Sequence, residues 1–129
     1  MKRILIFLSI CLPGFIMAQG INKVQYDENG KLNSALYGAD ASNYTFTHYY
    51  ASGIKSSTGK FKDGEKHGVW KTWDENGKLT AIAHYRNGEK TGTWIIHEPD
   101  HTSFEISFSH NHLLRAFKKD DHGHVVAAR

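Results

Sequence analysis

Histidines are the side chains of this sequence with the clearest capacity for chemistry. There are nine in 129 residues, and six of them form close pairs: His97 and His101, His110 and His112, and His122 and His124. Residues i and i+2 of a strand share a face, so His110 and His112 could both reach one metal ion. They flank Asn111 in a predicted turn, however, and no cysteine or carboxylate recurs at ligand spacing. We therefore interpret the histidines as exposed turn residues and predict no metal site.

A second candidate is the segment Gly88-Glu89-Lys90-Thr91-Gly92, which contains the residue types of a phosphate-binding loop. Such a loop requires Gly-Lys-Ser/Thr after four intervening residues and leads into a helix. Neither that order nor a helical pattern is present. We therefore predict that these glycines are turn residues.

Residue types that can act in catalysis are present, but no motif or spacing predicts that they lie together. Asp74 and Glu75 are adjacent carboxylates on a predicted hairpin turn, where neighbouring side chains point apart. Serine, histidine and aspartate all occur, yet no serine lies on a recognisable nucleophile elbow. We predict that the protein is not an enzyme and that it binds no cofactor.

The elements that carry these residues recur along the chain, which is the sign of a repeat architecture. Residues 85–94 repeat residues 61–70 at an offset of 24 (85 − 61). Residues 73–79 repeat residues 26–32 at an offset of 47 (73 − 26), nearly two periods. Aligned with itself at offsets of 23 (49 − 26) to 24 (73 − 49), the chain has three aromatic columns: Phe46, Trp70, Trp94 and Phe117; Tyr37, Phe61, Tyr85 and Phe108; and Tyr26, Tyr49 and Trp73.

Glycine-containing turns separate the aromatic segments. Asp63-Gly64, Asn76-Gly77 and Asn87-Gly88 are typical of type I′ hairpins, in which both central residues have positive φ. Asn111 stands where the next glycine is expected, and asparagine tolerates positive φ better than most residues. The segments between turns are rich in aromatic and β-branched residues, which favour strands. The predicted turn glycines are Gly30, Gly53, Gly64, Gly68, Gly77, Gly88 and Gly92.

We therefore predict an all-β fold, a row of antiparallel β-hairpins whose period is the offset of 23 to 24 found above. One hairpin is marginal alone, whereas stacked neighbours can cover each other's aromatic side chains. Residues 113–117 have some helix propensity, but the repeat register predicts a strand there. The column that contains Trp70 and Trp94 is expected to form the core.

The string Tyr85-Arg86-Asn87-Gly88, followed by Gly92 and Trp94, resembles the MORN repeat, as does Trp73-Asp74-Glu75-Asn76-Gly77. The likeness is closest to a variant found in bacterial proteins often labelled YwqK-type antitoxins. It is specific over residues 61–94 and looser on either side. The resemblance implies an elongated, twisted, single-layer antiparallel sheet. It also implies a binding or scaffolding role, with no catalytic residues to carry over.

The first eighteen residues have the pattern of a secretory signal peptide, predicted as a helix. Lys2 and Arg3 precede an apolar run, and Ala18 offers a cleavage site before Gln19. The apolar run is short of the ~20 residues that a membrane-spanning helix needs. Lipidation of Cys11 is the alternative, although Ile10 is a poor residue before a lipidated cysteine. We expect a repeat domain over residues 19–129, exported to the periplasm, the outer membrane or the extracellular space.

The charge balance narrows the class of partner. The formal charge of +3 falls to about +1 without Lys2 and Arg3 (14 basic minus 13 acidic residues), which gives no electrostatic case for nucleic acid or an anionic membrane. We expect a non-enzymatic protein-interaction or scaffolding module. The alternative is a carbohydrate-binding surface protein that uses exposed aromatics, with Tyr26, Tyr49 and Trp73 as the candidate ligand face. An antitoxin-like inhibitor or an envelope enzyme is a weaker alternative.

Overall fold

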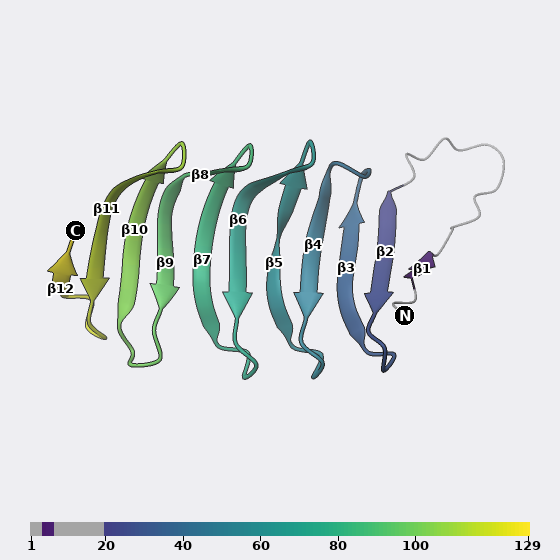
Figure 1. The fold of residues 1–129 in the computed structure, drawn as a ribbon, viewed down its shortest axis with the longest axis horizontal. Coiled ribbons are helices and arrows are strands. Elements are labelled where there is room, and N and C mark those ends of the chain that lie inside the picture. Colours follow the sequence, from purple (N-terminus) through teal and green to yellow (C-terminus); the bar gives the residue numbers. More distant parts are fainter. Residues whose placement is uncertain (1–3, 7–19) are drawn as a thin grey trace.

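The computed structural model describes residues 4–6 and 20–129, which form one open antiparallel sheet (Figure 1). Its strands lie side by side in chain order, except that β8 lies off this path and pairs with β7. This confirms the predicted row of hairpins. The strands are β1 (Ile4–Ile6), β2 (Ile21–Tyr26), β3 (Leu32–Gly38), β4 (Tyr44–Tyr49), β5 (Lys55–Lys62), β6 (Glu65–Trp73), β7 (Leu79–Arg86), β8 (Glu89–Lys90), β9 (Gly92–His97), β10 (Ser103–Ser109), β11 (His112–Lys119) and β12 (Val125–Ala128).

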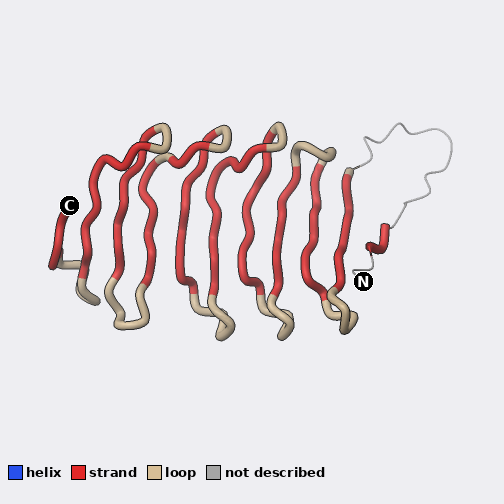
Figure 2. Tube along the Cα trace, in the orientation of Figure 1, coloured by secondary structure: helices blue, strands red, loops and turns tan. Residues whose placement is uncertain are grey.

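Strands and connecting loops account for all the described residues (Figure 2). Residues 113–117 lie in β11, as the repeat register predicted, and no described helix is long and apolar enough to cross a membrane. The predicted signal-peptide helix and its cleavage site between Ala18 and Gln19 lie outside the described residues, apart from Ile4–Ile6. Those three residues form β1, which pairs with β2.

Three of the four turns at one end of the strands are type I′ hairpins; the fourth, between β3 and β4, is a longer loop without positive φ. Asp63 and Gly64 have φ of 51° and 79°, and Asn87 and Gly88 have φ of 49° and 80°. Asn111, with φ of 68°, takes the glycine position of the third hairpin, as predicted. Both central residues thus have the positive φ that matches the twist of the flanking strands.

The turns at the other end have a longer loop, so the predicted type I′ turn at Asn76-Gly77 is wrong. Gly77 has φ of 81°, but Asn76 does not have positive φ. The Asp74 carboxylate accepts hydrogen bonds from the backbone N–H groups of Asn76 and Lys78, both at 2.9 Å. The Asp74 N–H donates to the Lys78 carbonyl. An aspartate at the first position satisfies two loop donors, which favours this loop over the two-residue turn.

The turn between β9 and β10 has histidine where the other long loops have glycine. His101 has φ of 66°, which costs an L-residue about 1–2 kcal/mol. We expect His101→Gly to raise the free energy of unfolding by about 0.5–1 kcal/mol, since relief of this strain should outweigh the entropy that glycine gains in the unfolded chain. Urea denaturation measures the change. His97→Gly, in the adjoining strand, is the matched control and should destabilise; a loss of stability in both variants would contradict the prediction.

Each type I′ hairpin is linked by a backbone hydrogen bond to the hairpin that precedes it at the same end of the sheet. The Gly64 N–H donates to the Ser42 carbonyl at 2.9 Å, and the Gly88 N–H donates to the Lys66 carbonyl at 2.9 Å. The Asn111 N–H donates to the Lys90 carbonyl at 3.1 Å. Each hairpin is therefore hydrogen-bonded to the one before it, and these bonds fix the register between neighbouring repeats.

Candidate functional site

One face of the sheet carries a continuous series of aromatic rings. Adjacent centroids lie 4.9 to 6.3 Å apart, within the range of favourable aromatic pairs. The rings share a face because cross-strand partners and alternate residues of a strand do so. We call this series the aromatic ladder and its side of the sheet the ladder face. The ladder consists of Tyr44, Phe61, Trp70, Tyr85, Trp94 and Phe108.

Trp70 is the most deeply buried ring of the ladder, with 7% of its surface exposed. Its indole lies directly over Gly59, whose missing Cβ leaves room for the ring. The indole N–H donates to the Lys60 carbonyl at 3.2 Å, and the Trp94 indole N–H donates to the His84 carbonyl at 3.0 Å. The other ladder rings are half-buried. A single-layer sheet thus buries aromatic area by laying rings along its own surface.

Two lysines lie over the ladder at equivalent positions of the repeat. Lys66 Nζ is 4.5 Å from the ring centroid of Trp70 and 5.0 Å from that of Tyr85. Lys90 Nζ is 5.3 Å from the centroid of Trp94 and 5.2 Å from that of Phe108. An ammonium group over an aromatic face is held by the ring quadrupole. The ladder therefore fixes two positive charges.

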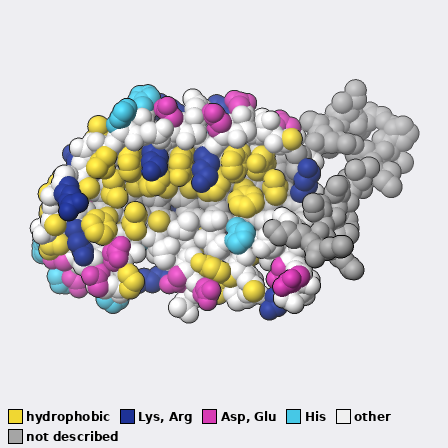
Figure 3. All heavy atoms as spheres, viewed as in Figure 1, with side chains coloured by type: hydrophobic (Ala, Val, Ile, Leu, Met, Phe, Trp, Pro, Cys, Tyr) yellow, Lys and Arg dark blue, Asp and Glu magenta, His cyan; other side chains and the backbone are white. Residues whose placement is uncertain are grey.

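The ladder face combines apolar surface with cations. Figure 3 shows hydrophobic side chains in a band across the strands, with Lys and Arg side chains on the band and Asp and Glu side chains toward its rims. Among the described residues, the ion pairs of lysine involve only Lys118 and Lys119. Lys66 and Lys90 thus have no carboxylate partner within the described part of the chain. Partial burial also raises the pKa of the Tyr85 hydroxyl above its ordinary value.

The ladder differs from the predicted aromatic columns at both ends of the array. Tyr37 pairs with Thr45, on the face opposite Tyr44, and is 69% exposed. Tyr44, which the column alignment missed, takes the ladder position beside Phe61.

At the other end, Ala116 and not Phe117 follows Trp94 through Ile106, so Phe117 lies on the opposite face. The turn after β11 begins at Asp120, which follows Glu98 at an offset of 22 (120 − 98), so the repeat there is shorter than 24. Phe46 stays on the ladder face, opposite Gly59.

The predicted ligand-face residues Tyr26, Tyr49 and Trp73 lie at the ends of β2, β4 and β6, beside the long loops. All three are half-buried. The Tyr50 hydroxyl donates to the Trp73 carbonyl at 2.9 Å. No ring contact joins the three among residues 20–129. They form a row of separate rings, whereas the ladder is continuous.

Residues 66–87, which run from Lys66 through β7 into the next type I′ turn, match the family model of the MORN repeat variant. This segment therefore carries a MORN repeat of the variant type. The match carries no information about the YwqK-type label. A comparison with curated proteins finds no match. The matched segment contains Trp70, the Asp74 turn and Tyr85, so it is one full unit of the ladder.

The signal that could have identified the two lysines was in the repeat itself. Lys66 and Lys90 occupy the same place in two repeated strings of the sequence, at an offset of 24 (90 − 66). In the sequence, Lys90 lies in the segment that shares only its residue types with a phosphate-binding loop. The structure places it in β8, over Trp94 and Phe108.

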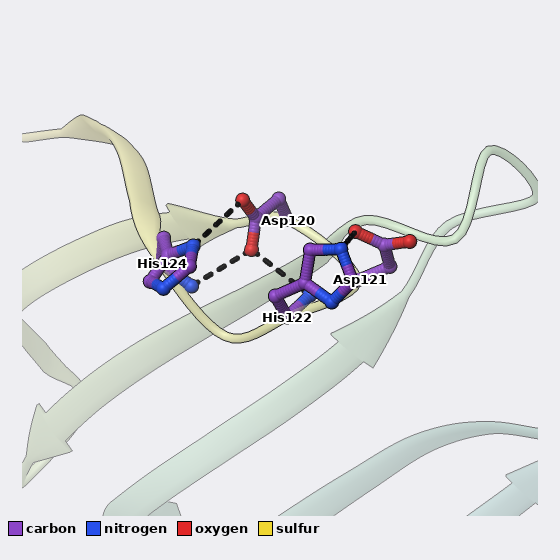
Figure 4. A network of polar contacts seen from close by, with 4 residues as sticks. All are labelled: Asp120, Asp121, His122 and His124. Carbon is purple, nitrogen blue, oxygen red and sulfur yellow. Dashed lines mark hydrogen bonds and ion pairs between the residues drawn. The ribbon is translucent and has the colours of Figure 1, made fainter.

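Four of the nine histidines lie in turns, and the other five lie in strands: His48, His67, His84, His97 and His112. Among the described residues, no group of three or more His, Cys, Asp or Glu side chains is placed to hold a metal ion. Figure 4 shows the last loop, where the Asp120 carboxylate accepts hydrogen bonds from the backbone N–H groups of His122 and His124. The His122 ring lies beside Asp121. This network closes the turn between β11 and β12.

Three loop aspartates give the stability a predictable dependence on acid. Backbone hydrogen bonds from Ser42 and His124 lower the pKa of Asp40 and Asp120, respectively, and the Thr102 hydroxyl lowers that of Asp100. A lowered pKa in the folded state gives stability that is present above the unfolded pKa and is lost as pH falls through the folded value. We expect the melting temperature to hold from neutral pH to about pH 4 and to fall below it.

The matched variant changes all three aspartates to asparagine. It should melt at a lower temperature at neutral pH, and its melting temperature should fall less steeply in acid. Thermal melts by circular dichroism between pH 7 and pH 2 compare the two proteins. An equally steep acid loss in the variant would assign the pH dependence to other carboxylates.

Proposed function

We propose that this protein is a non-enzymatic interaction module that binds a protein partner on its ladder face. The observation that carries the proposal is the pair of lysines, without ion pairs in the described part of the chain, over a continuous run of half-exposed rings. Aromatic rings are enriched at protein interfaces, where they supply apolar area, and charges that complement the partner set its orientation. The repeat architecture supports the proposal, because stacked hairpins present an extended surface.

We further propose that the protein works outside the cytoplasm. The charge-then-apolar pattern of residues 1–18 supports export and cleavage before Gln19. Intact-mass measurement of the protein recovered from its native cells tests this directly. A mass that corresponds to residues 19–129 supports the proposal, and an intact N-terminus retained in the cytoplasm contradicts it.

Comparative capture tests the interaction. The protein is expressed as the full chain, purified as processed by the cell and immobilised, and envelope proteins retained on it are identified by mass spectrometry. The test variant carries Lys66→Glu and Lys90→Glu on the ladder face. The matched control carries Lys31→Glu and Lys78→Glu, two exposed lysines of the long loops with the same change of charge.

We expect a partner that the wild type and the loop control retain and that the ladder variant loses. Equal retention by all three proteins would contradict the ladder face as the binding surface. Retention of polysaccharide in place of protein, with loss in Trp73→Ala, would favour carbohydrate binding at the row of Tyr26, Tyr49 and Trp73.

A further inference from the structure

We propose that the ladder face binds a proline-rich segment in the polyproline II conformation that carries Asp or Glu at every third position. This inference rests on the proposed function and names the chemistry of the partner. It follows from the spacing of the two lysines, the rings between them and the position of the carboxylates toward the rims of the band.

The spacing of the lysines comes from the order of the strands. Lys66 lies on β6, and Lys90 on β8 leads directly into β9. β7 alone lies between β6 and β9 in the sheet. Neighbouring strands lie about 4.8 Å apart, so equivalent positions on β6 and β9 are separated by about 9.5 Å. A ligand that runs across the strands meets a positive charge at this interval.

Among regular peptide conformations, polyproline II fits this interval most closely. Its three residues per turn rise about 9.3 Å, so every third side chain points the same way at that distance. An extended strand repeats its side-chain direction every two residues, about 6.8 Å. Two turns of an α-helix rise about 10.8 Å. Over one lysine interval, polyproline II therefore stays in register better than either alternative.

The surface between the lysines suits proline. Tyr85 lies between Trp70 and Trp94, with centroids 6.3 Å and 5.2 Å away. Aromatic-lined surfaces bind polyproline II segments because flat rings pack against pyrrolidine rings and the ligand is already ordered. Lys66 and Lys90 then face the acidic residues, whose carboxylates accept hydrogen bonds from the ammonium groups. The rings thus contact the prolines and the lysines contact the acidic residues of a ligand whose sequence repeats every three residues.

A peptide titration tests the period directly. The probe is acetyl-(Pro-Pro-Glu)₄-amide, and the spacing control is a peptide of identical composition with its four glutamates in one block. Tryptophan fluorescence and calorimetry measure binding to the protein, expressed as the full chain and purified as processed by the cell. We expect saturable binding of the probe and markedly weaker binding of the block peptide.

The variants repeat the matched pair described above. Lys66→Glu with Lys90→Glu should weaken binding of the probe on the order of tenfold, because each attraction becomes a repulsion. Lys31→Glu with Lys78→Glu should change it by less than about twofold. Circular dichroism and melting confirm that each protein is folded. Absence of binding by the folded wild type, equal affinity for the block peptide, or equal affinity of the two variants would overturn the inference.

Anionic vesicles of phosphatidylcholine and phosphatidylserine separate a membrane from a peptide ligand. Vesicle binding that depends on Lys66 and Lys90, without binding of the probe, would assign the face to lipid and overturn the inference. The proposed function has a separate outcome. If a protein is captured through the two lysines while the probe peptide does not bind, the result supports protein binding on the ladder face. It rejects the inference that the ligand is a polyproline II segment.

Discussion

Replacing Gly59 with valine is expected to lower the free energy of unfolding by about 3 kcal/mol. A Cβ at this position would lie far inside the van der Waals contact distance from Cγ, Cδ2 and Cε2 of the Trp70 indole. Valine favours strands more than glycine does, so intrinsic propensity alone predicts a gain in stability. Strand propensity predicts a more stable variant and steric overlap with the ring predicts a less stable one. We expect the steric overlap to dominate the change in the free energy of unfolding. Chemical denaturation measures the difference.

Lys60→Val is the matched control for Gly59→Val. Lys60 follows Gly59 on the same strand but is exposed on the face opposite the ladder, so valine there does not meet the Trp70 ring. This variant should change stability by no more than about 0.5 kcal/mol. Equal changes in the free energy of unfolding at the two positions would mean that Trp70 does not lie over Gly59. The described geometry of the ladder would then be wrong.

Trp70→Ala is expected to cost about 3–5 kcal/mol, the range for truncation of a large buried aromatic. The ring contacts Phe61 and Tyr85, carries Lys66 over its face and donates a hydrogen bond to the Lys60 carbonyl. Alanine removes all four interactions at the centre of the ladder. Circular dichroism should follow the unfolding, because the variant also changes the fluorescence.

Trp73→Ala is the comparison for Trp70→Ala. Trp73 lies three residues along the same strand, is half-buried and makes no ring contact among the described residues. Its loss should cost about 1–2 kcal/mol. If Trp73→Ala proved the more damaging change, the main core would lie beside the long loops and not along the ladder.

Much of this fold follows from the sequence alone, because turn chemistry and the repeat period agree. Positive φ at Asp63-Gly64, at Asn87-Gly88 and at Asn111 was predictable, since few residues tolerate that conformation. The Asn76-Gly77 loop was not correctly predicted. Its geometry depends on Asp74, two residues earlier, whose carboxylate bonds to the loop backbone. A dipeptide rule does not include that partner.

The ladder was predictable in part. The repeat located Trp70 and Trp94, but a column of equivalent residues does not say which rings from different columns touch. Tyr44 replaces Tyr37 because the register between β3 and β4 decides which residue faces Phe61. The two lysines gained significance only when the sheet placed them over rings. The repeat period alone does not show which face of the sheet a lysine side chain lies on.

The strand order also makes the length of this surface adjustable. Because every strand pairs with neighbours that are close in the chain, one unit can be added or lost without rebuilding contacts elsewhere. Tandem duplication of one unit, such as residues 61–84, would add two strands, one further lysine over the ladder (the equivalent of Lys66) and about 9.5 Å to the array. The number of units, which recombination can change, would then determine the length of ligand that the protein can span.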